Sequence, residues 1–388
     1  MQRRRRNIVV LRSDSQDSLA KTDAFSAAAR SLGLEVREQP DRDTLAILPA
    51  SDFRALDAAW MARTYGVPGP DPVMVAIATS KSLTYEFLRR RGFPLLRWCV
   101  PQSARDLGVR WPGPVFVKPD AGSGSVSAKP WGYRAFPSLL DFQRFLVRGN
   151  LTAQFYQAQR DPQQRHLVME YVAARELWSI ATVAGDGPAM LYDTNVMTAM
   201  PRWNVIERLL VGARHPDTGS ALRMARALAA AGLRRSVIYV QCMQRGGRLY
   251  PMDLNLRPGT MWSHCAQALG VRAHEEILAV LLGLKARPSI KWPAPYVGVA
   301  RVPMRSGPAE VRAEFRHRAA IPLIERTAFA RSRPLDNGQA WPRFAVLCER
   351  PRDFARKARA IIAATRITPR RDARSGSRRS ARSSPRAG

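Results

Sequence analysis

The chain has 388 residues, of which 46% are hydrophobic and 24% are charged, and it carries a formal net charge of +31. This length and composition favour a globular protein of two or three packed domains over a single core or a disordered chain. No apolar run approaches the roughly 18 residues that a membrane-spanning helix needs, so no transmembrane helix is expected.

The four cysteines indicate a reducing compartment. Cys99, Cys242, Cys265 and Cys348 show no CxxC spacing and have apolar neighbours, which is typical of reduced core thiols. The basic start of the chain is followed by a five-residue apolar stretch at 7–11, which is too short for a signal peptide. We therefore expect a cytoplasmic protein with neither a zinc site nor a disulfide framework.

Residues 1–78 alternate between strand and helix. The expected strands are 8–11, 34–37 and 45–48, and the expected helices are 19–32 and 53–65. Such alternation predicts βαβ units and a parallel sheet. The segment contains no GxGxxG, so it is not interpreted as a dinucleotide site.

A lysine lies in each of the next two elements that the sequence predicts, a helix and then a strand. Lys81 is close to the start of a helix that ends near Gly92, and Lys118 ends an apolar strand that begins at Val115. The Gly/Ser loop that follows, 122–125, lets backbone N–H groups approach phosphate oxygens, and the lysine adds a point charge. The lysine precedes the glycines, so this is not a Walker A loop, and an ordinary hairpin turn is the alternative interpretation.

Residues 167–180 form two apolar strands around a short link with an acidic group on each side. Glu170 and Glu176 are six residues apart, so the link could present one carboxylate to an adenine edge and the other to ribose hydroxyls. The alternative is a hairpin with glutamates on its surface.

The most informative segment is 240–259, which predicts two antiparallel strands joined by a turn at 246–247. Pairing of these strands brings Gln241, Asp253 and Asn255 together as oxygen donors, with Arg257 two residues further on the same face. Oxygen donors with one carboxylate suit Mg²⁺, and the arginine could complement a phosphoryl group in transfer. The alternative is a surface hairpin that happens to carry polar side chains.

In this order and at these spacings, the segments resemble the ATP-grasp superfamily, in particular the branch of carbamoyl phosphate synthetase, biotin carboxylase and many carboxylate–amine ligases. The likeness runs from about residue 67 to 283. It implies an α/β (α+β) ATP-grasp fold with a Rossmann-like N-terminal βαβ domain, a lid subdomain and a small C-terminal β-rich domain. The implied boundaries are 1–78, then 79–292 with a lid at about 112–170, then 293–368, and last a disordered Arg/Ser tail at 369–388.

The resemblance also implies a role for each matching residue. The cofactors are ATP and Mg²⁺ (or Mn²⁺), and the catalytic residues are Arg257 and Lys118. The ATP-binding residues are Lys81, Lys118, Gly122, Ser123, Gly124, Ser125, Glu170, Val172 and Glu176, and the metal ligands are Gln241, Asp253 and Asn255. Two positions depart from the family pattern, because Asp253 replaces the usual glutamate and Ala174 a common glycine.

The substrate pocket is less well defined. Residues 193–217 are poorly periodic and are interpreted as a long loop, in which Arg202 could bind a carboxylate bidentately and Trp203 could pack an apolar side chain. Trp262 and His264 are further candidates, the histidine as a general base. The alternatives are core tryptophans and a structural histidine.

Past residue 293 the sequence predicts strands at 296–302 and 344–348 and a helix at 352–364. The tail is rich in arginine and lacks large apolar residues, so we expect it to be disordered and to attract polyanions nonspecifically. It has no aromatic residues for base stacking, which argues against a dedicated nucleic-acid function.

These observations predict an ADP-forming ligase that activates a small-molecule carboxylate as an acyl phosphate and couples it to an amine or similar nucleophile. The alternatives are a carboxylase-like enzyme that phosphorylates bicarbonate, a nucleotide-binding protein without catalysis, and a protein that binds polyanions through its tail.

Overall fold

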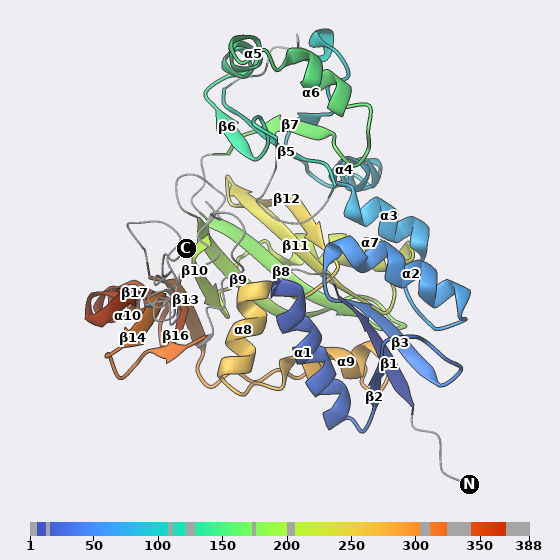
Figure 1. Cartoon of the computed structure of the whole chain (residues 1–388), viewed down its shortest axis with the longest axis vertical. Helices are drawn as coiled ribbons and strands as arrows, with labels where there is room; N and C mark the ends of the chain where they lie inside the picture. The colour runs from blue at the N-terminus through green and yellow to red at the C-terminus, as the bar shows by residue number, and fades with distance from the viewer. Residues whose placement is uncertain are drawn as a thin grey trace, which may run out of the picture.

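An eight-stranded antiparallel sheet forms the centre of the protein, in the order β12-β11-β8-β9-β10-β13-β16-β15 (Figure 1). The computed structural model describes residues 6–12, 16–107, 111, 113–121, 129–172, 176–199, 206–302, 311–323 and 343–369. The strands of the central sheet are β8 (Glu176–Ala184), β9 (Met190–Ala199), β10 (Ile206–Val211), β11 (Ser236–Arg245), β12 (Arg248–Asn255), β13 (Tyr296–Arg301), β15 (Ile321–Pro322) and β16 (Arg343–Cys348).

Helices cover both faces of this sheet, so its strands are apolar on both sides. One face packs against α1 (Gln16–Ser31), α8 (Thr260–Ala268) and α9 (Ala273–Leu281). The other packs against α3 (Pro72–Thr79), α7 (Thr218–Ala230) and α10 (Pro351–Ala364). Burial of apolar side chains on each face is the main stabilising contribution to this architecture.

The N-terminal segment forms the parallel sheet that its sequence predicts. The strands β1 (Asn7–Leu11), β2 (Glu35–Arg37) and β3 (Thr44–Pro49) pair in the order β2-β1-β3, with β1 parallel to both neighbours. A 3₁₀ turn, η1 (Asp52–Arg54), and α2 (Ala55–Thr64) follow β3 and lead towards the central sheet.

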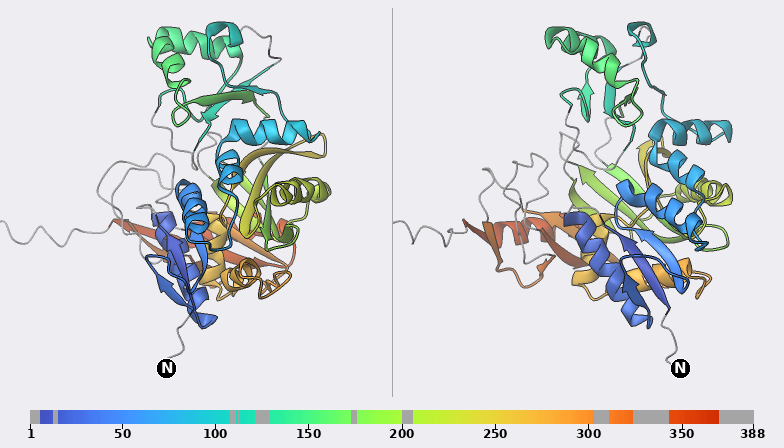
Figure 2. Two further views of the ribbon diagram at one scale, coloured as in Figure 1. Left: turned by 90° about the vertical axis from the view of Figure 1, so that its right-hand side faces the viewer. Right: turned by 45° about the vertical axis from the view of Figure 1, so that its right-hand side comes forward.

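A separate lobe stands above the central sheet (Figures 1 and 2). Its four-stranded sheet has the order β4-β7-β5-β6, and two helices cover it. The lobe consists of β4 (Trp98–Cys99), η2 (Ala104–Leu107), β5 (Val115–Pro119), β6 (Arg134–Phe136), α5 (Leu139–Arg148), α6 (Thr152–Ala158) and β7 (His166–Glu170). Buried Trp131, Phe142 and Phe155 form a core of its own. The helix α4 (Lys81–Arg90) lies between this lobe and the central sheet.

The interpretation of residues 193–217 as a long loop was wrong for most of that stretch, because β9 and β10 occupy much of it. Asp193, Thr194 and Asn195 are all buried in the middle of β9. Polar residues inside the protein remove the apolar alternation on which strand prediction depends.

The C-terminal strands are divided between two sheets. β13, β16 and β15 continue the central sheet, while β14 (Val311–Phe315) pairs with β17 (Thr365–Pro369). The first residue of the expected tail, Pro369, is therefore the last residue of a strand. In the described ranges, no helix is long and apolar enough to cross a membrane.

Candidate active site

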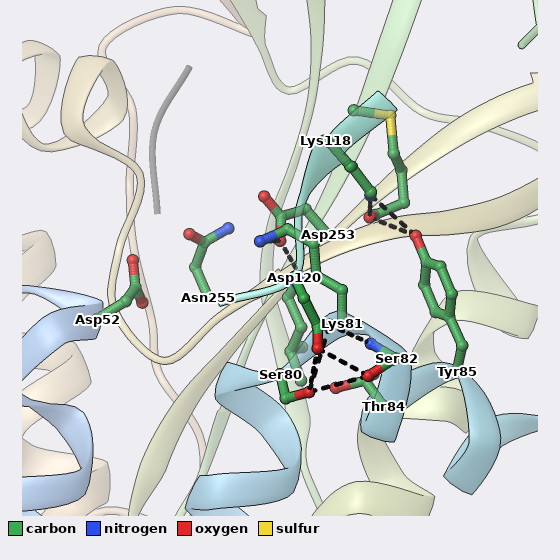
Figure 3. A network of polar contacts seen from close by, with 12 residues as sticks. Asp52, Ser80, Lys81, Ser82, Thr84, Tyr85, Lys118, Asp120, Asp253 and Asn255 are labelled. Atoms are coloured by element: carbon green, nitrogen blue, oxygen red, sulfur yellow. Dashed lines mark hydrogen bonds and ion pairs between the residues drawn. The ribbon is translucent and has the colours of Figure 1, made fainter. Parts of the chain in front are cut away.

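Residues from three elements meet where the upper lobe faces the end of the central sheet. Lys81 comes from α4, Lys118 from β5, and Asp253 and Asn255 from β12 (Figure 3). These elements are far apart in the sequence, and the packing of the lobe over the sheet brings their side chains into one network.

The hairpin of β11 and β12 forms as predicted. Gly246 and Gly247 make the turn with φ of 54° and 74°, a left-handed conformation that glycine adopts without strain. The register places Gln241 directly opposite Asp253. Asn255 is two residues beyond Asp253 on the same face. A register shift between Gln241 and Cys242 brings Gln241 level with Asp253, so the three predicted oxygen donors lie together.

This donor set fits a hard divalent cation. It offers one carboxylate and two amide groups, and Mg²⁺ commonly combines few protein oxygens with water and substrate phosphates. The part of the chain that the structure describes contains no cluster of three His, Cys, Asp or Glu side chains arranged for a metal. Among the three proposed ligands, Asp253 supplies the only negative charge.

Lys81 is the first residue of α4, and the hydroxyl of Ser80 caps this helix. The Lys81 side chain is buried, and its Nζ lies 3.6 Å from Oδ1 of Asp253 (Figure 3). An ammonium at the positive end of a helix dipole is electrostatically unfavourable without an anion nearby. This cation is therefore placed where an anionic ligand would be stabilised.

Lys118 is fully buried in β5. Its Nζ donates a hydrogen bond to the Tyr85 hydroxyl at 2.9 Å and another to the Met252 carbonyl (Figure 3). Burial lowers the pKa of Lys118 to about 7, with Asp253 raising it and Lys81 lowering it further. The Lys118 side chain therefore loses its proton more readily than an exposed lysine, and a nearby phosphate would favour its charged form.

Asp120 is a site residue that the sequence interpretation missed. Its carboxylate is fully buried and accepts hydrogen bonds from the backbone N–H and the hydroxyl of Ser82, at 2.7 and 2.8 Å. It also pairs with Arg165 Nε, and its backbone carbonyl accepts from Lys81 N–H at 3.0 Å. Asp120 therefore joins the start of α4 to the base of the upper lobe.

The link between β7 and β8 is not a hairpin. The two strands belong to different sheets, β7 to the upper lobe and β8 to the central sheet, so the link crosses from one to the other. Glu170 at the end of β7 pairs with Arg245, Val172 is half-buried and Glu176 is exposed. The hairpin of the alternative interpretation is thus excluded, whereas the nucleotide roles of Glu170, Val172 and Glu176 stay predictions.

Arg257 lies just beyond β12 and is only 15% exposed. Its Nε lies 2.8 Å from Oδ2 of Asp52, and one terminal nitrogen lies 3.5 Å from Oδ1 of Asn255. The sequence interpretation did not find Asp52, which comes from the N-terminal segment.

Two of the proposed substrate residues lie in the core. Trp262 is 1% exposed, and its Nε1 donates to the carboxylate of Asp193, whose pKa is raised to about 7 by burial. His264 is also buried, with Nδ1 3.3 Å from a terminal nitrogen of Arg343. These contacts favour packing roles for both residues. Arg202, Trp203 and the loop Gly122, Ser123, Gly124 and Ser125 lie outside the described residues.

No protein-family model and no curated protein sequence matches this chain. Solved structures do match it. The L-amino acid ligase from Bacillus licheniformis has a TM-score of 0.66 at 11% identity, covering 95% of this chain and 100% of that one. The carboxyaminoimidazole ribonucleotide synthase from Aspergillus clavatus, complexed with ATP, has a TM-score of 0.66 at 12% identity, with 93% and 98% covered.

Biotin carboxylase from Campylobacter jejuni is similar as well, with a TM-score of 0.64 at 13% identity and coverage of 94% and 92%. The likeness extends over nearly the full length of all three chains. The protein therefore has the ATP-grasp fold, and the predicted resemblance is confirmed at the level of the fold.

Proposed function

We propose that the protein is an ATP-dependent, ADP-forming carboxylate–amine ligase. The observation that carries this proposal is the convergence of Lys81 and Lys118 on the face of β12 that presents Asp253 and Asn255. Two buried cations beside an oxygen-rich hairpin suit a nucleotide triphosphate bound with a divalent cation. The fold shared with an L-amino acid ligase supports the same class of reaction.

In the proposed reaction, a carboxylate oxygen of the first substrate attacks the γ-phosphorus of ATP, and the bond to the β-phosphate oxygen breaks to release ADP. The acyl phosphate then reacts at its carbonyl carbon with an amine, and inorganic phosphate leaves with the bonding electrons. Catalysis of this kind depends mostly on positioning and charge neutralisation.

The residues of this chain divide that work among them. Lys81 and Lys118 neutralise the phosphates, and the terminal nitrogens of Arg257 stabilise charge on the group in transfer. By the resemblance to ATP-grasp enzymes, Glu170 and Val172 would contact the adenine and Glu176 the ribose. Gln241, Asp253 and Asn255 would hold Mg²⁺, which would help to neutralise the charge of the phosphates.

A panel of carboxylates and amines, scored for ATP consumption, tests the proposal. With the correct acid, hydroxylamine should trap the acyl phosphate as a hydroxamate, with one ADP formed for each hydroxamate. The Asp253→Asn variant, purified in parallel, shows how much ATP use comes from contaminating enzymes. Formation of AMP and pyrophosphate would refute the mechanism, because it indicates an acyl adenylate.

The same assay separates the alternatives. Activity with bicarbonate alone among the acids would favour a carboxylase-like enzyme. Tight binding of Mg·ATP without turnover on any acid would favour a nucleotide-binding protein without catalysis.

A further inference from the structure

The buried carboxylate of Asp52 bridges the N-terminal segment and the end of β12. Asp52 is 8% exposed and lies at the start of η1, more than 200 residues from its partners in the sequence. Its Oδ1 accepts a hydrogen bond from the backbone N–H of Leu256 at 3.0 Å, and its Oδ2 lies 2.8 Å from Nε of Arg257. One carboxylate thus holds both the backbone and the side chain at the residues where β12 ends.

The ion pair with Asp52 is the shortest contact of the Arg257 guanidinium in the structure. One terminal nitrogen lies 3.2 Å from the carbonyl of Pro258 and the other 3.5 Å from Asn255 Oδ1. Neither of these partners is ionised, whereas Asp52 is a carboxylate with 6% side-chain exposure, where an unpaired charge is costly. The Oδ2 atom of Asp52 makes this ion pair without hydrogen-bond geometry, so the carboxylate holds the Nε side of the guanidinium by charge. The two terminal nitrogens keep longer contacts with neutral oxygens, which an incoming oxyanion could replace.

We propose that Asp52 is a positioning residue for Arg257, which sets the orientation in which this arginine meets the γ-phosphate. The inference rests on the proposed function and adds to it a role for the N-terminal segment. Asp52 touches no substrate; it acts through Arg257. Because of this contact, the position of η1 against the end of β12 determines the orientation of the Arg257 guanidinium.

The test compares Asp52→Asn with a matched control, Asp57→Asn. Asp57 lies five residues away and pairs with Arg54 at 2.7 Å, but its side chain is 53% exposed and far more accessible to water. Asp52→Asn should lower kcat by about 10- to 100-fold, as expected for a misplaced catalytic group, and change KM for ATP by less than about threefold. Asp57→Asn should leave both constants unchanged.

A double-mutant cycle with Arg257→Gln distinguishes positioning from a general structural effect. If Asp52 acts through Arg257, the double variant should be no slower than Arg257→Gln alone. Losses that multiply in the double variant would overturn the inference. So would an unchanged or increased kcat in Asp52→Asn, since that result would make Asp52 a competitor of the phosphate.

Nucleotide binding gives a readout that does not need turnover. Asp52→Asn should reduce the preference for a non-hydrolysable ATP analogue over ADP, because only the former carries the γ-phosphate. An unchanged preference would overturn the inference even if wild type proves to be an active ligase. Conversely, if wild type turns over no acid but Asp52→Asn shows the predicted loss of preference, only the ligase proposal is refuted.

Discussion

Asp253 combines two functions at the residue scale, because it is the only carboxylate among the proposed metal ligands and also the partner of Lys81. Asp253→Asn should lower phosphoryl transfer by at least about two orders of magnitude, as the loss of an electrostatic stabiliser does elsewhere. Binding of ATP through the lysines should persist. Rapid-quench measurement of ADP formation, together with a fluorescent nucleotide titration, tests both. The assignment of Asp253 as a metal ligand would be contradicted if a chelator abolished phosphoryl transfer in wild type while Asp253→Asn still transferred the phosphoryl group.

Lys118 gives the site a dependence on pH. Its pKa in the folded protein, about 7, is lower than the 10.5 of an exposed lysine because burial disfavours the charged form. The unfolded chain therefore binds more protons than the folded one between about pH 7 and 10.5. In that window the contribution of Lys118 makes the folded state more stable as the pH rises.

The affinity for ATP, in contrast, should fall as the pH rises. Phosphate stabilises the ammonium, so ATP must bind with uptake of a proton above pH 7, and affinity should fall by up to about tenfold per pH unit. Dissociation constants of a fluorescent ATP analogue between pH 6 and 9 measure this effect. Lys118→Met serves as the comparison, because it leaves in place both partners of the hydrogen bond that the Tyr85 hydroxyl donates to the Met252 carbonyl at 2.6 Å. Parallel pH profiles for the two proteins would exclude Lys118 from the phosphate site.

At the scale of elements, Asp120 couples the upper lobe to α4. Asp120→Ala leaves Arg165 and both Ser82 donors without their shared acceptor, and breaking a buried pair of this kind costs about 3 kcal/mol or more. The same change should weaken ATP binding, because the Asp120 carboxylate holds Ser82, the neighbour of Lys81 at the start of α4. Chemical denaturation and nucleotide titration measure the two effects. Asp186→Ala, which removes a carboxylate with 65% side-chain exposure, should change neither. A stable Asp120→Ala protein with normal ATP affinity would show that the two elements are held by other contacts.

Elements with a local signal could be predicted from the sequence. The βαβ alternation predicted the parallel sheet, and Gly246 and Gly247 between two alternating strands predicted the hairpin. The register shift between Gln241 and Cys242, which sets Gln241 opposite Asp253, had no signal in the sequence. The strand β9 could not be predicted in this way, because Thr194 and Asn195 place polar groups inside the protein. Their partners explain the burial: Thr194 donates to the Ala213 carbonyl, and Asn195 accepts from the Tyr239 hydroxyl at 3.2 Å.

The same distinction holds for the candidate site. Lys118, Asp253 and Asn255 stand in recognisable patterns at the ends of strands, so their types and spacing sufficed to propose them. Asp52 and Asp120 have no such pattern. Each acts through partners that only the tertiary fold brings near, 204 residues away for Asp52 and 38 for Asp120.

At the scale of the whole molecule, the net charge of +31 raises the question of whether the basic C-terminal segment serves the enzyme or a polyanion. Residues 370–388 contain many arginines and a single Asp, without the large apolar residues that would build a core. The last described strand, β17, ends at Pro369 and pairs with β14. The pairing of β17 with β14 uses no residue beyond Pro369, so we predict that the basic segment can be removed without loss of the fold.

Ending the chain after Pro369 should leave the free energy of unfolding and ATP turnover unchanged, since β17 keeps all its partners. Heparin affinity should fall, and its dependence on salt should become less steep because fewer counterions are released. A full-length variant with glutamine in place of the tail arginines keeps the length but removes the charge, so it should match the truncated protein. If only the truncated protein loses ATP turnover, the site needs the segment itself but not the charge of its arginines. Loss in both would mean that its arginines take part in binding the nucleotide, and the separation of the two functions would be refuted.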